Sequence, residues 1–193
     1  MHLVLMRHGE PVRDAADALD PALSGRGADQ VSAAVPYVLA AGIEVIYSSP
    51  QMRARQTAEM VAEPLGLPIV FDDALVEFDH GAPYVHYDDA QADVWRHYLA
   101  GDLTPWGTTA AQFHDRVSLV MNRIATEQAG RRVLVVCHGG VINVWTCQLF
   151  GVPDRLRVME PGYASLHRYE REDDVWSVRS LNEVAPVRVS TLK

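Results

Sequence analysis

Two histidines of this chain each follow a short apolar run and are each followed by a glycine. Arg7 and His8 come after the run 3–6, and His138 comes at the end of the run 133–137. Short apolar runs bounded in this way are typical of buried parallel strands. Because ligands of open α/β sheets bind just beyond the carboxyl ends of the strands, we expect Arg7, His8 and His138 to meet over one substrate.

Two further segments supply a cation and a carboxyl group. The segment 48–58 places Arg53 in the first turn of a helix that follows a strand. A helix N-terminus attracts phosphate, and an arginine there adds bidentate contacts to an anion. The segment 75–81 offers the carboxyl group of Glu77 in a loop. The four segments together favour an anion-binding site that contains two imidazoles and an acid.

The elements that must position these residues alternate along the chain. Strands are predicted at 3–6, 45–47, 69–71 and 133–137, with a hairpin at 166–169 and 175–181 around the polar turn 170–174. Helices are predicted from the N-cap Ser24 to Gly42 and at about 52–65, 90–99, 109–129 and 140–150, with a loop at 72–87. This alternation predicts an α/β fold, a three-layer α/β/α sandwich with a mostly parallel central sheet and an antiparallel C-terminal hairpin.

Length and composition are those of an ordinary globular chain. The 193 residues are 48% hydrophobic and 22% charged, and we expect one domain that spans 1–193. A formal net charge of −8 argues against nucleic acid or an anionic membrane as the main partner. The two cysteines, Cys137 and Cys147, imply no disulfide framework. Without a signal peptide or an apolar run of membrane length, we expect a cytoplasmic protein.

The four segments stand in the order typical of the histidine phosphatase superfamily, also called the phosphoglycerate mutase-like family, which this chain resembles. Residues 20–24, with Gly27 and Gln30, resemble a further stretch of that family, and 164–165 and 180–182 resemble its closing strands. The resemblance spans nearly the whole chain and implies a phosphoglycerate mutase-like fold. We expect the segment 80–108 to cap the pocket.

The resemblance also implies a reaction, the hydrolysis of small phosphate monoesters without a metal or another cofactor. His8 is then the nucleophile that forms a phosphohistidine, and Glu77 is the acid that protonates the departing alkoxide. The charge of the transferred phosphoryl group is stabilised by Arg7, Arg53 and His138. The residues implied to contact the substrate are Arg7, Gly9, Glu10, Arg53, His138 and Gly139.

The spacing of residues along the chain argues against two other catalytic schemes. A cysteine phosphatase that used Cys137 would need an arginine six positions later, where Asn143 stands. Cys137 is therefore expected to be a buried apolar residue. A metal hydrolase would show histidines and carboxylates at ligand spacing, such as two histidines four apart on a helix, and the sequence has no such pair. His80 and His86, near the acidic loop, are expected at the surface.

Three alternatives stay open. A mutase of this family passes the phosphoryl group to a second hydroxyl, but Arg13 and Asp14 stand where the mutases carry a tryptophan-asparagine pair, which favours a phosphatase. A non-catalytic module that binds phosphorylated ligands would lack a catalytic residue, and every expected position is filled. A phosphoprotein is the third alternative, in place of a small-molecule substrate.

The capping segment is rich in aromatic residues, namely Tyr84, Tyr87, Trp95, Tyr98 and Trp106. We expect these side chains to pack the cap itself. Should some of them face the pocket instead, an aromatic or extended organic phosphate would be favoured over a small sugar phosphate.

Overall fold

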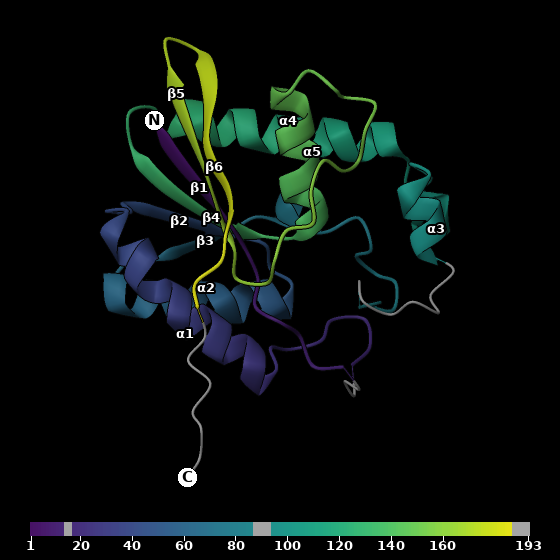
Figure 1. Cartoon of the computed structure of the whole chain (residues 1–193), viewed down its shortest axis with the longest axis horizontal. Coiled ribbons are helices and arrows are strands. Elements are labelled where there is room, and N and C mark those ends of the chain that lie inside the picture. The colour runs from purple at the N-terminus through teal and green to yellow at the C-terminus, as the bar shows by residue number, and fades with distance from the viewer. Residues whose placement is uncertain (14–16, 87–93, 187–193) are drawn as a thin grey trace.

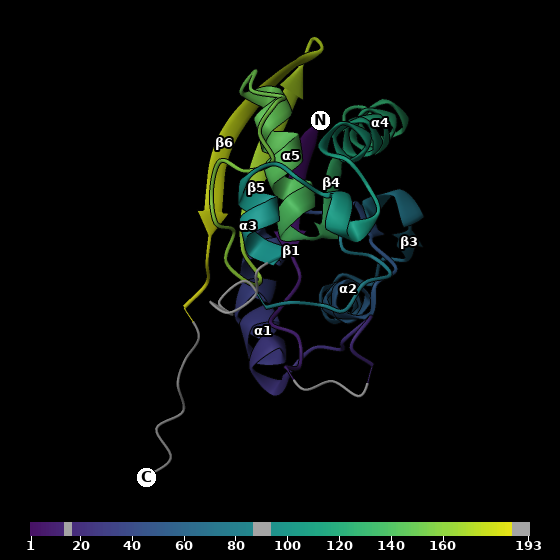
Figure 2. The same cartoon turned by 90° about the vertical axis from the view of Figure 1, so that its right-hand side faces the viewer.

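A six-stranded sheet runs through the centre of the protein, and helices cover both of its faces (Figure 1, Figure 2). The computed structural model describes residues 1–13, 17–86 and 94–186. The strands are β1 (His2–Arg7), β2 (Val45–Ser48), β3 (Ile69–Phe71), β4 (Arg132–Cys137), β5 (Leu166–Glu172) and β6 (Val175–Glu183). The helices are α1 (Gly25–Ala40), α2 (Met52–Leu65), α3 (Val94–Leu99), α4 (Ala110–Glu127) and α5 (Gly139–Leu149), with short 3-10 helices at Asp73–Leu75 and Thr104–Trp106.

The strand order is β3-β2-β4-β1-β5-β6. The first four strands in this order are parallel, whereas β5 is antiparallel to β1 and β6 is antiparallel to β5. The predicted fold class, a mostly parallel α/β sheet with an antiparallel C-terminal hairpin, is therefore confirmed.

Successive residues of a strand point to opposite faces of the sheet, and the central strands are apolar on both. In β1, Leu3 and Leu5 join the core formed with α4 and α5, while Val4 and Met6 join the core formed with α1 and α2. All four side chains are buried, and burial of each contributes about 1.5–3 kcal/mol. This double burial anchors β1 firmly and fixes where its last residues lie.

The pairing register brings the chemical groups together. β1 lies beside β4 with Arg7 opposite Cys137, so the next residues along the two strands, His8 and His138, emerge side by side. The backbone N–H of His8 continues the ladder by donating to the carbonyl of Cys137 at 3.0 Å. On the other side of β4, the N–H of Ser49 donates to the carbonyl of Val136 at 3.0 Å. Three segments that are far apart in sequence thus meet at the carboxyl ends of the neighbouring strands β1, β4 and β2.

The predicted helix limits are close to those observed. The Ser24 hydroxyl caps α1 by accepting from the N–H of Gly27 at 3.0 Å, a contact worth about 1 kcal/mol. Helix α2 has the predicted bounds and ends at Gly66, whose φ of 65° suits a residue without a side chain. Helix α4 begins with a capping box between Thr109 and Gln112. Of the helix predicted at 90–99, the part from Val94 is observed as α3, and 90–93 lie outside the described residues.

Two local predictions were wrong. The loop predicted at 72–87 contains the 3-10 helix Asp73–Leu75. The hairpin turn predicted at 170–174 is shorter, because β5 continues to Glu172 and Asp173 and Asp174 alone make the turn, both with positive φ. Such a two-residue turn matches the twist of the flanking strands, so the polar residues before it can stay in the ladder.

The structure also locates the cysteines and the longer helices. Cys137 and Cys147 are both buried and are not bonded to each other. Among the helices that the structure describes, none is both long and apolar enough to cross a membrane.

Candidate active site

His8 comes directly after β1, where it is buried but lines a cavity. Its Nδ1 lies 2.8 Å from the carbonyl oxygen of Gly9. A carbonyl oxygen only accepts hydrogen bonds, so Nδ1 carries the proton and Nε2 keeps a free lone pair. Burial, followed by the charges of Arg53 and Arg7, lowers the pKa of His8 well below its ordinary value. The ring is therefore neutral near pH 7.

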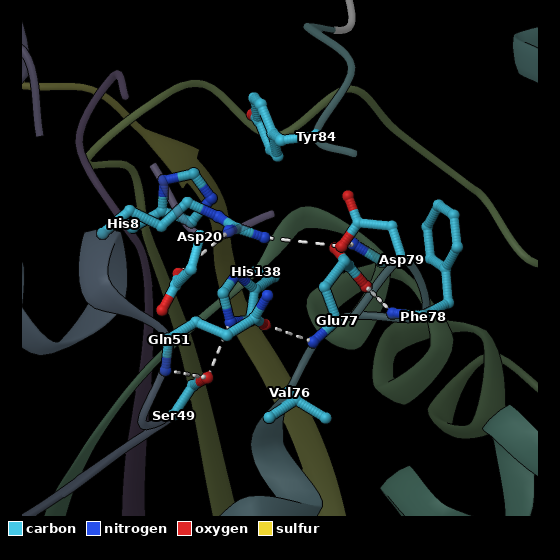
Figure 3. A network of polar contacts seen from close by, with 12 residues as sticks. His8, Asp20, Ser49, Gln51, Val76, Glu77, Phe78, Asp79, Tyr84 and His138 are labelled. Atoms are coloured by element: carbon cyan, nitrogen blue, oxygen red, sulfur yellow. Dashed lines mark hydrogen bonds and ion pairs between the residues drawn. The ribbon is translucent and has the colours of Figure 1, made fainter. Parts of the chain in front are cut away.

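His138 lies beside His8, with 5.1 Å between the ring centroids. Its Nε2 is 2.8 Å from the hydroxyl of Ser49, which comes from the end of β2 (Figure 3). Burial, and then the charge of Arg53, lower the pKa of His138 well below its ordinary value. Nδ1 of His138 is buried and has no hydrogen-bond partner among the described residues.

Two arginines flank the histidines. The backbone N–H of Arg7 donates to the carbonyl of Ser165, and its guanidinium donates to the carbonyl of Pro161. Arg53, in the first turn of α2, is 1% exposed, although a charged side chain is costly to bury. Its Nε and Nη1 have no hydrogen-bond partner among the residues that the structure describes. Buried donors without acceptors are what a site for an anion requires.

Arg53 is balanced by two carboxylates. Its Nη2 is 3.4 Å from Asp79, and its Nη1 is 3.7 Å from Asp20. Asp20 also accepts from the N–H of Met52 at 2.8 Å and so caps the start of α2. Sequence reasoning did not predict either contact, because both join residues more than 25 positions apart.

Glu77 lies across the site from His8 (Figure 3). Its Oε2 accepts from the N–H of Gly140 at 2.7 Å, and its Oε1 accepts from the N–H of Phe78 at 3.1 Å. The side chain of Gln51 accepts from the backbone N–H of Glu77 at 2.8 Å and holds the loop against α2.

The carboxyl group of Glu77 is held close to its protonation midpoint at neutral pH. Burial, and then the charge of Asp79, raise its pKa to about 7. The two backbone N–H groups and Arg53 oppose this rise. Burial raises the pKa of Asp79 as well, against the charge of Arg53.

The two glycines after His138 allow the start of α5 to enter the site, and both line its cavity. A Cβ atom on Gly140 would lie 2.3 Å from Oε1 of Glu77, so a side chain there would displace the carboxyl group. A Cβ atom on Gly139 would lie 3.6 Å from the guanidinium of Arg7, which is an ordinary contact.

Three of the predicted substrate contacts, His138, Gly9 and Glu10, are not part of the cavity lining. His138 is fully buried beside His8, whereas Gly9 and Glu10 lie against α1. Gly9 donates to the hydroxyl of Thr57 at 3.1 Å, and a Cβ atom there would come within 2.5 Å of the Gly27 carbonyl oxygen. Glu10 pairs with Arg26 at 3.5 Å, on the side of α1. Their positions indicate that they hold the chain after β1 against α1.

Three further residues considered in the sequence analysis are His80, His86 and Cys137. His80 is exposed as expected, whereas the expectation was wrong for His86, which is buried with its ring 4.9 Å from that of Tyr84. Cys137 is buried in the core, and burial raises the pKa of its thiol far above the ordinary value. A thiol in that state is a poor nucleophile.

The cavity in front of His8 is also lined by aromatic residues. Tyr84, Trp95 and Tyr98 face it, so the expectation that the aromatic side chains only pack the cap was wrong for these three. Trp106 does pack, with its ring 4.9 Å from that of Phe78. Tyr87 lies outside the described residues.

Comparison with known proteins identifies the family. The sequence model of the histidine phosphatase superfamily, branch 1, matches residues 3–184. The chain belongs to this superfamily. The resemblance seen in the four segments is thereby confirmed for nearly the whole chain.

Relatives in the histidine phosphatase superfamily include both mutases and phosphatases. A probable phosphoglycerate mutase of Escherichia coli, GpmB, is 27% identical over 191 residues, covering 91% of this chain and 87% of the relative. A mycobacterial glucosyl-3-phosphoglycerate phosphatase is 25% identical, with a TM-score of 0.78 over 94% of this chain and 98% of that one. A phosphoserine phosphatase of Entamoeba histolytica, solved with phosphoserine, shares the fold at 18% identity and a TM-score of 0.75, covering 94% of this chain and 96% of that one. The family and these neighbours indicate a phosphatase or a mutase.

Proposed function

We propose that this protein hydrolyses phosphate monoesters through a phosphohistidine on His8, without a metal ion. The observation that carries the proposal is the state of the His8 ring. It is neutral, with its Nδ1 proton held by the Gly9 carbonyl, and it stands beside two buried arginines. A neutral imidazole with a free Nε2 lone pair is a nucleophile for phosphorus.

In the first step, Nε2 of His8 attacks phosphorus and the bond from phosphorus to the ester oxygen breaks. Protonated Glu77 gives its proton to the leaving oxygen, so an alcohol departs. In the second step, the Glu77 carboxylate takes a proton from water, and the oxygen of that water attacks phosphorus. The phosphorus–nitrogen bond breaks, inorganic phosphate is released, and neutral His8 and protonated Glu77 are restored.

The charge on the non-bridging oxygens is stabilised by Arg7, Arg53 and His138. The buried Nε and Nη1 of Arg53 and the Nδ1 of His138 supply donors that make no hydrogen bond to any described residue. We assign the hydroxyl of Ser49 as the donor to Nε2 of His138, which leaves the His138 proton on Nδ1 for the phosphoryl oxygens. Preorganised donors of this kind stabilise developing charge without reorganisation.

The experiment is the hydrolysis of p-nitrophenyl phosphate in EDTA by the native protein, His8→Ala and His2→Ala. His2 stands at the opposite end of the same strand and is half exposed, so it is a matched control. We expect the native protein and His2→Ala to be equally active, and His8→Ala to lose more than about 1,000-fold. Activity that survives in His8→Ala, or that EDTA abolishes, would contradict the proposal.

The acceptor of the phosphoryl group distinguishes the proposed phosphatase from a mutase, because a phosphatase transfers the group to water. Quenched reactions with radiolabelled substrate should show a phosphoenzyme that is labile to acid and absent in His8→Ala. Incubation with 3-phosphoglycerate should release inorganic phosphate or leave the compound unchanged. Formation of 2-phosphoglycerate would show a mutase, and tight binding of phosphorylated ligands without any turnover would show a binding module.

A further inference from the structure

The cavity in front of His8 has a charged end and an apolar end. Arg7, His8 and Arg53 belong to the charged end, which would hold the phosphoryl group. The apolar residues of the lining include Val85, Trp95, Tyr98 and Leu99. Tyr98 stacks on Phe78 with 5.0 Å between ring centroids, and the Trp95 ring lies 5.8 Å from that of Tyr98. The apolar wall, defined as Phe78, Val85, Trp95, Tyr98 and Leu99, thus contains three aromatic rings in a row, from Phe78 through Tyr98 to Trp95.

Two tyrosines cover the charged end. The guanidinium of Arg53 lies 4.6 Å from the ring centroid of Tyr84, and that of Arg7 lies 4.2 Å from the ring centroid of Tyr163. The hydroxyls of the two tyrosines are 3.3 Å apart. Figure 3 shows Tyr84 on the side of the site opposite to Ser49. The tyrosine pair therefore closes over the arginines, and the rest of a substrate has to extend past it.

The proposed reaction fixes the direction in which the substrate extends. In an in-line displacement the leaving oxygen lies opposite the attacking nitrogen, so it points away from His8. The leaving oxygen must also reach Glu77, which protonates it. Phe78 follows Glu77 in the chain and begins the apolar wall. The carbon skeleton of the leaving alcohol therefore lies along that wall.

Most polar side chains of this lining already have partners within the protein. Asn143 donates to the carbonyl of Gly139 at 3.1 Å and accepts from the N–H groups of Val158 and Met159. Arg157 and Glu160 pair with each other at 3.3 Å at the half-exposed rim. A leaving group rich in hydroxyl or carboxylate groups would lose water here and gain few partners beyond the rim, which is costly.

We propose, resting on the function given above, that the apolar wall selects phosphomonoesters whose leaving alcohol carries an aryl or bulky apolar group. Polar leaving groups such as polyols or amino acids fit this end of the cavity poorly. Trp95 and Leu99, both on α3, are the specificity-determining side chains, because they reach the cavity from the capping segment.

The test compares 2-phenylethyl phosphate with ethyl phosphate. Both release a primary alcohol, so the intrinsic reactivity of the two esters is similar and the difference in kcat/KM reports contact with the phenyl ring. Burial of a ring of this size predicts a preference of at least about tenfold for the phenylethyl ester. Glycerol 3-phosphate and phosphoserine should be no better than ethyl phosphate.

Three variants test which side chains produce the preference for the phenylethyl ester. Trp95→Ala and Leu99→Ala should each lower the preference at least about threefold, mainly through the phenylethyl ester. Leu99 is 63% exposed, so its substitution leaves the core intact even if Trp95→Ala disturbs the cap. Leu119→Ala is the control, because Leu119 is 72% exposed on α4 and lies outside the cavity lining. It should keep the native preference.

The two proposals fail in different ways. If no ester is hydrolysed, or if His8→Ala stays active, the proposed function fails. If p-nitrophenyl phosphate is hydrolysed in a His8-dependent manner but ethyl and phenylethyl phosphate have equal kcat/KM, only the apolar selection is overturned. A preference for glycerol 3-phosphate or phosphoserine would overturn it as well.

Discussion

Burial favours the neutral form of two residues in this site, the base His8 and the acid Glu77. It disfavours the charged form of each, so near pH 7 His8 is neutral and Glu77 keeps its proton in about half of the molecules. An imidazole nucleophile needs its lone pair, and a carboxylic general acid needs its proton. The same dry surroundings therefore prepare both groups for the first step, with Asp79 adding to the effect on Glu77.

The first prediction concerns the pH dependence of hydrolysis. Because the protonated form of Glu77 is the active one and its pKa is about 7, kcat/KM for an alkyl phosphate should fall about tenfold per pH unit above that value. Asp79→Asn removes a negative charge that raises this pKa, so the descending limb should move to lower pH. A pH profile of kcat/KM for the native protein and this variant measures both effects.

Glu77→Gln is the companion variant for that profile. The variant should show no descending limb in the pH profile of kcat/KM. It should also lose most activity on esters with poor leaving groups, since a good leaving group departs without a proton. A limb that persists unchanged in Glu77→Gln, or equal losses for all leaving groups, would rule out Glu77 as the acid.

At the scale of elements, the start of α5 positions the acid. The N–H of Gly140 holds Glu77, and there is no space for a Cβ atom at this position. This close approach explains why a glycine is needed in the first turn of a helix that is otherwise buried and apolar.

Gly140→Ala should therefore displace the carboxyl group of Glu77 and lower kcat about 10- to 100-fold, because small misplacements of catalytic groups are costly. Gly25→Ala is the control, since a Cβ atom on Gly25 at the start of α1 would meet nothing within 4 Å. Steady-state kinetics and thermal melts of both variants make the comparison. Native kcat in a folded Gly140→Ala protein would show that Glu77 is not held in this way.

Elements with strong local signals could be predicted from the sequence. The apolar runs gave the strands that end in His8 and His138, and Ser24 and Gly66 marked helix limits that the structure confirms. Contacts between distant segments could not be predicted in the same way. Ser49 meets His138 across 89 positions, and no local pattern signals that a hydroxyl will face that ring.

At the scale of the whole molecule, an acidic protein encloses a cationic centre. The net charge is −8, yet Arg7 and Arg53 lie buried together at the edge of the sheet. Asp20 and Asp79 offset only part of the charge of Arg53, and its Nε and Nη1 donate no hydrogen bond to any described residue. An anion that supplies acceptors should therefore stabilise the folded state.

Inorganic phosphate should raise the melting temperature. At ten times its dissociation constant, a ligand that binds only the folded state stabilises it by about 1.4 kcal/mol, which is about 3–6 °C for a chain of this size. The rise should disappear in Arg53→Met. Sodium chloride at equal ionic strength is the control for screening, and an equal rise with chloride would show that the effect is not site-specific. A rise retained in Arg53→Met would show that this arginine does not hold the anion.

The pairing of β1 with β4 fixes the spacing of His8 and His138, whereas the walls of the cavity can vary. Neighbouring strands lie about 4.8 Å apart, and the two imidazoles, 5.1 Å apart, inherit their separation from that spacing. The separation therefore depends on the pairing of two buried strands and not on a loop. The cavity walls on α3 and on the segment 157–161 carry no such constraint. Exchanging those two segments offers a route by which the same chemistry could acquire new substrates, in evolution or in the laboratory.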